Sequence, residues 1–180
     1  QKILEYFKPK FLLGMTATPE RTDDYNIFSL FNYNIACEIR LPRAMEEDLV
    51  CPFHYFGISD LKINGEEIDE KSDFNNLVSD QRINHIINVL REYGTDSGVT
   101  RGLIFCSSVE EAKEMSIEFN KRDFNTIALS GEDPETSRAS AMEKVELSGG
   151  DEKLDYIFTV DIFNEGIDIP SVNQIVMLRP

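Results

Sequence analysis

Residues 102–112 read GLIFCSSVEEA, and this stretch decides the fold class. The apolar run from Gly102 to Cys106 is typical of a strand that is buried on both faces. Two serines follow, and Ser108 with Glu111 three residues later resembles a capping box at the start of a helix. A buried strand that leads through a short polar loop into a helix is the repeating unit of a parallel α/β sheet.

The same alternation continues on both sides of this stretch. A helix is predicted before it, because four apolar residues recur at helical spacing, at Ile83, Ile86, Ile87 and Leu90. Further strands are predicted at residues 125–129, 154–160 and 174–178. Asp133, as a cap ahead of Pro134, is expected to begin the helix between the first two. The order βαβαββ with short connections predicts an α/β fold, with a mostly parallel sheet flanked by helices.

The first part of the chain has a different character. Residues 11–13 are predicted to be a short buried strand that leads into a loop at residues 14–19. Residues 1–48 are therefore expected to be the C-terminal end of one domain. Residues 49–73, aromatic and then acidic, are expected to be a linker or excursion, and residues 74–180 to form a second domain.

Composition limits the classes of function. The formal net charge is −15, from 18 Lys and Arg against 33 Asp and Glu, which argues against a protein held on nucleic acid by its overall charge. The cysteines, Cys37, Cys51 and Cys106, are too widely spaced to indicate a zinc site or a disulfide framework, so a reducing, cytoplasmic compartment is expected. No apolar run approaches the roughly 20 residues of a membrane span. Because the chain starts without Met and stops at Pro180 directly after an apolar run, we expect both ends to be cuts.

Small or polar residues follow four of the expected strands. They are Thr16, Ala17 and Thr18; Ser107 and Ser108; Ser130 and Gly131; and the run 159–170, which contains Gly166 and Asp168. In an open parallel sheet, ligands bind at the carboxyl ends of the strands. The sequence therefore predicts a site where backbone N–H and hydroxyl groups approach a phosphate.

Taken in this order, the segments resemble the C-terminal half of the superfamily 2 helicase core. Residues 14–21 (GMTATPER) are similar to motif III of its DNA-directed branch, residues 103–108 (LIFCSS) to motif IV, and residues 159–170 (TVDIFNEGIDIP) to motif V. The resemblance points to the restriction-type or repair-type, ResIII-like helicases. It implies a RecA-like domain, truncated at residue 180, that is preceded by the tail of another RecA-like domain.

The resemblance also implies roles for individual residues. Gly166 and Asp168 would face ATP, while Thr16, Ala17 and Thr18 would couple the nucleotide state to the grip on the strand. Five residues would contact nucleic acid, namely Ser107, Ser108, Ser130, Gly131 and Thr159. The expected partners are single-stranded or duplex DNA and the missing part of the first RecA-like domain.

The chain has neither a phosphate loop nor an acidic magnesium motif, and motif VI would lie beyond Pro180. ATP and Mg²⁺ are therefore expected to bind in the parent protein, and this chain alone is expected to be inactive, with no complete catalytic set and no metal of its own. One alternative is a noncatalytic RecA-like module that binds nucleic acid or protein. A second is an RNA helicase.

Overall fold

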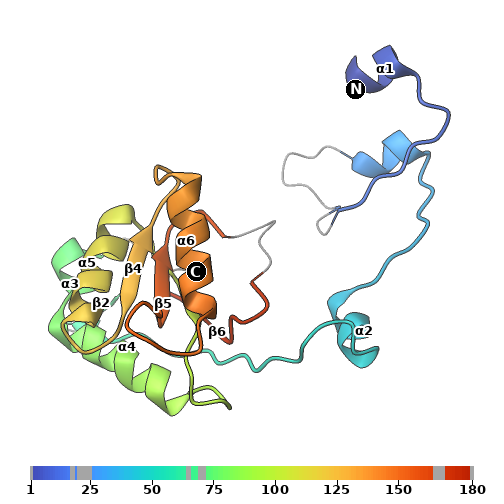
Figure 1. The fold of residues 1–180 in the computed structure, drawn as a ribbon. Helices are drawn as coiled ribbons and strands as arrows, with labels where there is room; N and C mark the ends of the chain where they lie inside the picture. The colour runs from blue at the N-terminus through green and yellow to red at the C-terminus, as the bar shows by residue number, and fades with distance from the viewer. Residues whose placement is uncertain are drawn as a thin grey trace. The chain divides into compact units, whose positions relative to one another are not determined.

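The computed structural model describes residues 2–16, 19, 26–63, 66–68, 72–163 and 169–178. It divides into two compact units, residues 1–56 and residues 57–180 (Figure 1). The division lies inside residues 49–73, the predicted linker. The assignment of residues 1–48 to a first RecA-like domain stays a prediction.

The described part of the first unit consists of short helices and irregular segments. It contains α1 (Lys2–Phe7), the 3-10 helix η1 (Ile27–Phe31) and α2 (Leu41–Glu46). The side chain of Asn26 accepts a hydrogen bond from the Phe28 N–H at 3.0 Å, which caps η1.

The prediction of a buried strand at residues 11–13 is wrong for this structure. Phe11 is 93% exposed and Leu13 is 77% exposed, and the described part of the first unit contains no strand. A strand needs a neighbour to satisfy its backbone groups, and no described residues pair with residues 11–13. The ring of Phe31 instead covers Gly14, where a Cβ would lie 2.5 Å from the ring.

The second unit is built on a parallel sheet with the order β4-β5-β3-β6. Its strands are β3 (Gly102–Phe105), β4 (Thr126–Leu129), β5 (Tyr156–Thr159) and β6 (Gln174–Met177). All four lie where the sequence predicts strands, and the predicted α/β class is confirmed. The acidic stretch before them adds an antiparallel pair that was not predicted, β1 (Lys62–Ile63) and β2 (Glu66–Glu67).

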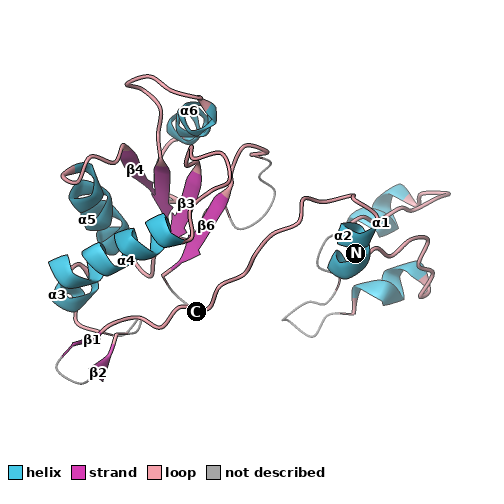
Figure 2. Cartoon of the chain, turned by 90° about the horizontal axis from the view of Figure 1, so that it is seen from below, coloured by secondary structure: helices cyan, strands magenta, loops and turns pink. Residues whose placement is uncertain are grey.

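Helices cover both faces of this sheet, as Figure 2 shows. The short α3 (Phe74–Leu77), α4 (Asp80–Glu92) and α5 (Val109–Asn120) lie on one side, and α6 (Glu135–Glu146) lies on the other. Ile83, Ile86, Ile87 and Leu90 of the predicted stripe all pack into the core between α4, α5 and the sheet. A second core cluster joins Ala141 and Val145 of α6 to the opposite face.

Aromatic rings fill the larger core. Phe119 is fully buried, and its ring makes edge contacts with Tyr156 and Phe158 at centroid distances of 6.1 and 5.0 Å. The Tyr156 hydroxyl donates to Oε1 of Gln174 at 2.6 Å, and burial raises the pKa of Tyr156 far above its ordinary value. Gly102 leaves room for that ring, because a Cβ at this position would lie 2.3 Å from Cδ1 of Tyr156.

Candidate functional site

The loops after β3, β4 and β5 leave the same edge of the sheet. The strands are parallel, and Phe105, Thr159 and Leu129 lie in one row of the register. The topology therefore brings Ser107 and Ser108, Ser130 and Gly131, and the segment after Thr159 to the carboxyl edge, where ligands of parallel sheets bind.

The loop after β3 is fixed by α5. The Ser108 hydroxyl accepts the Glu111 N–H at 3.1 Å, as a capping box predicts. The Glu111 carboxylate, however, accepts the N–H of Ser107 at 2.8 Å through Oε2, one residue before the expected donor. The Ser107 hydroxyl is buried and has no hydrogen-bond partner among the described residues. A buried hydroxyl without a partner is costly, so its presence calls for an explanation, and a functional role is one such explanation.

The loop after β4 turns around Asp133. Its Oδ2 accepts the Ser130 N–H at 2.7 Å and the Ser130 hydroxyl at 2.9 Å. These bonds lower the pKa of the Asp133 carboxyl, and the charges of Lys113 and Arg138 lower it further. The predicted capping role of Asp133 is wrong, because α6 begins at Glu135 behind Pro134 without a side-chain cap. The carboxylate is engaged by Ser130 instead.

Thr159 lies beneath the edge. It is fully buried, and its hydroxyl donates to the Ile162 carbonyl at 3.4 Å. Its own carbonyl accepts the Cys106 N–H at 2.9 Å, which joins the ends of β5 and β3. The described surroundings of Thr159 are thus structural, and its assignment to nucleic acid stays a prediction.

The backbone after β5 is unusual. Asp161 and Phe163 have φ angles of 54° and 65°, in the left-handed region that side-chain-bearing residues rarely adopt. Such residues cluster at ligand clamps and switch segments, where the surroundings enforce the strain. Gly166 and Asp168, which were predicted to face ATP, lie outside the described residues, as do Ala17 and Thr18. Thr16 is described and is exposed in the first unit.

Two cations near this edge were not singled out from the sequence. Lys113 and Arg138 act on Asp133, and Nε of Arg138 is buried without a partner among the described residues. We call the loops at residues 107–108 and 130–131 the serine loops. The sequence signal that could have identified Lys113 and Arg138 is their position in the helices that directly follow these loops. Among the described residues, no group of three or more His, Cys, Asp or Glu side chains could bind a metal ion.

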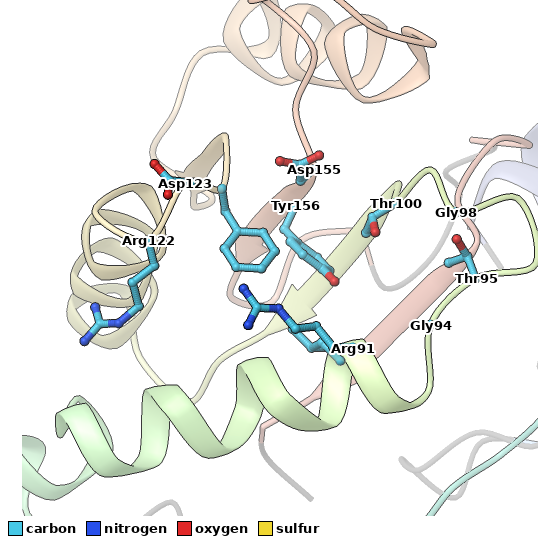
Figure 3. Close-up of a pocket in the computed structure, with 11 residues that line it drawn as sticks. Arg91, Gly94, Thr95, Gly98, Thr100, Arg122, Asp123, Asp155 and Tyr156 are labelled. Atoms are coloured by element: carbon cyan, nitrogen blue, oxygen red, sulfur yellow. The ribbon is translucent and has the colours of Figure 1, made fainter.

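A cavity of about 560 Å³ opens at the opposite, amino edge, beside Thr100, Asp155 and Tyr156. Arg91, Arg122 and Tyr156 are among the residues that line it (Figure 3). The Arg91 guanidinium carbon lies 6.0 Å from the centre of the Phe124 ring. None of the site residues predicted from the sequence lines this cavity, so the serine loops remain the candidate site.

Within the described ranges, no helix is long and apolar enough to cross a membrane.

The parallel sheet, the two helical layers and the loops at its carboxyl edge define a RecA-like α/β domain. Residues 81–180 match the family of the helicase conserved C-terminal domain. The chain belongs to this family, and its second unit carries the C-terminal RecA-like domain of a superfamily 2 helicase.

The individual proteins that the chain resembles share a low sequence identity with it. The chain is 22% identical, over its whole length, to a 51.5 kDa protein of a Lactococcus phage (isolate 7-9), of which it spans 39%. It is 32% identical over 91 residues, or 51% of its length, to the ATP-dependent RNA helicase SrmB of Haemophilus influenzae, of which it spans 20%. Among solved structures, the DEAD-box helicase domain 2 of Mss116p bound to an RNA duplex aligns with a TM-score of 0.41 at 20% identity. That alignment covers 58% of this chain and 39% of the other.

Proposed function

We propose that this chain belongs to the ATP-driven motor of a superfamily 2 helicase or translocase, in which the second unit contacts one strand of nucleic acid. The supporting observation is the meeting of the Ser107 and Ser130 loops at one sheet edge, in a domain of the helicase C-terminal family. Hydroxyl and backbone N–H groups position phosphates without reading sequence, which suits a motor that moves along any strand.

ATP and Mg²⁺ belong to the parent protein in this proposal. Gly166 and Asp168 would face ATP in the cleft between two RecA-like domains, and Thr16, Ala17 and Thr18 would couple nucleotide state to strand grip. Residues 1–48 would complete a first RecA-like domain, and residues 49–73 would link the two. Opening and closing of the cleft would then step one domain along the strand.

We propose DNA as the strand, in a restriction-type or repair-type protein, on the basis of the residues TATPER at 16–21. A specific observation favours RNA instead, because three curated relatives are named RNA helicases: SrmB, DBP3 of Meyerozyma guilliermondii and spb4 of Schizosaccharomyces pombe. The deciding experiment compares ATP hydrolysis by the full-length protein with single-stranded DNA and with RNA of the same sequence. Stronger stimulation by RNA refutes the DNA assignment, and no hydrolysis with either strand favours the noncatalytic module.

The isolated chain gives a separate prediction. We expect no nucleic-acid-stimulated ATP hydrolysis and only weak binding to single-stranded DNA, because the net charge is −15 and any phosphate contacts are local. Fluorescence anisotropy between about 50 and 200 mM salt measures the binding, which should weaken as salt rises. Tight binding that does not respond to salt would contradict the proposal.

A further inference from the structure

Arg82 is a charged side chain inside the core. Only 1% of its surface is exposed, and three acceptors surround its guanidinium. Its Nε donates to Oδ2 of Asp60 at 2.7 Å, and its Nη1 donates to the Leu77 carbonyl at 2.9 Å and to Oε1 of Glu111 at 2.8 Å. No motif or periodicity in the sequence singles out this arginine.

The second carboxylate of this network contacts the candidate site. Glu111 is fully buried, and its two oxygens face different partners: Oε1 accepts from Arg82, and Oε2 accepts the N–H of Ser107 at 2.8 Å. One guanidinium is thus joined to the loop after β3 through a single side chain. A shift of the Arg82 side chain would therefore move Glu111, and with it the backbone of Ser107.

A buried ion pair is weak support for stability, because desolvation offsets most of its attraction. Apolar residues of similar size would fill this space at least as well. The network instead fixes geometry. It joins Asp60, in the segment that enters the second unit, to α4 and to the first turn of α5, and every charged end has a hydrogen-bond partner.

We propose that Arg82 is a positioning residue: through Glu111 it holds the Ser107 backbone, and with it the buried Ser107 hydroxyl, in place, and through Asp60 it links the entering segment at residues 57–61 to the same loop. This inference rests on the proposed function, in which the loop contacts nucleic acid. A change in the path of the entering segment would then alter the strand contact without touching the strand.

The test is Glu111→Gln in the full-length protein. The substituted amide keeps the size of the side chain but has a single acceptor oxygen, so either Arg82 or Ser107 must face its NH₂ group. Arg82 still has Asp60 as its ion partner. The matched control is Glu110→Gln, which removes the same charge from the same turn of α5 but alters an exposed side chain.

We expect Glu111→Gln to raise the Kd for single-stranded nucleic acid by up to about tenfold relative to Glu110→Gln, because a loop that Glu111 no longer holds must be ordered when the strand binds. The nucleic-acid concentration for half-maximal ATP hydrolysis should rise with it, while kcat at saturating strand stays near the control. Amide exchange at Ser107 should become faster in Glu111→Gln and stay unchanged in Glu110→Gln. A purely structural role of Glu111 would lower the melting temperature and leave the Kd of the folded protein equal to that of the control.

Asp60→Asn is the second variant, in case Glu111→Gln fails to fold. It keeps a neutral acceptor for Arg82 on the outer side of the network, where Asp60 is 24% exposed. We expect a Kd increase of roughly twofold to threefold over Asp96→Asn, an exposed control, because a neutral acceptor bonds more weakly than a charged one. Equal Kd values for each variant and its control refute this inference alone. A wild-type protein that binds neither DNA nor RNA refutes the proposed function and this inference with it.

Discussion

Gly102→Ala should destabilise the second unit through one contact. The added Cβ would lie 2.3 and 2.4 Å from Cδ1 and Cε1 of Tyr156, where carbon atoms normally stay about 3.5–4.0 Å apart. The ring cannot swing aside freely, because it is buried against Phe119 and its hydroxyl bonds Gln174 at 2.6 Å. Overpacking of this kind costs about 1–3 kcal/mol. Loss of the hydrogen bond to Gln174 adds about 1 kcal/mol to this cost. The lower entropy of the unfolded chain with alanine offsets about 0.4–1 kcal/mol of it.

The expected net loss is therefore about 1–3.5 kcal/mol of unfolding free energy, or roughly 4–14 °C in melting temperature for a unit of this size. Urea unfolding followed by circular dichroism measures it. Gly149→Ala is the matched control, since a Cβ there has no atom within 4 Å and should change the stability by less than about 0.5 kcal/mol. If the clash is the cause, Tyr156→Leu in the Gly102→Ala background should cost less than it does alone. Equal stability of the two alanine variants would refute the reasoning.

Two further substitutions test the core and the serine loop. Phe119→Ala should cost about 3–5 kcal/mol in urea unfolding, because the ring is fully buried among Phe124, Tyr156 and Phe158; a loss below about 1.5 kcal/mol would contradict this packing. Asp133→Ala should lower the melting temperature at neutral pH, since Ser130 loses its acceptor. Because the pKa of Asp133 is lowered in the folded state, its stabilisation is present above the ordinary Asp value of about 3.9 and is lost as the pH falls through the folded pKa. The difference in melting temperature between the two proteins should therefore narrow as the pH falls below about 3.9, and a constant difference would exclude the carboxylate as the cause.

The strands and helices of the second unit were predictable because local patterns and burial agree there. The apolar run at residues 102–106 and the stripe from Ile83 to Leu90 carry their own periodicity, and both pack as expected. Residues 11–13 have the same apolar character, but no strand pairs with them in the part of the chain that the structure describes, so the pattern alone could not make them a strand. Local pattern predicts an element only where a partner is present to pair with it.

The site was predictable at the level of loops but not of individual contacts. Parallel topology places the ends of β3, β4 and β5 at one edge, which the sequence order alone implies. The Glu111 carboxylate accepts the N–H of Ser107 and not, as a capping box predicts, that of Ser108. The Asp133 carboxylate accepts hydrogen bonds from Ser130 instead of capping a helix. Arg82 could not be found from sequence, because its carboxylate partners Asp60 and Glu111 lie far from it along the chain.

The central position of β3 in the sheet also affects how the protein folds while it is being synthesised. β3 pairs with β5 and with β6, and both of these strands come later in the sequence. While the ribosome adds residues 106–155, the apolar run of β3 has no strand beside it, and α5 can shield only one of its faces. An unpaired, uncharged apolar strand is prone to aggregate. Expression at low temperature or with added chaperones should therefore raise the soluble yield more than changes to the purification buffer do.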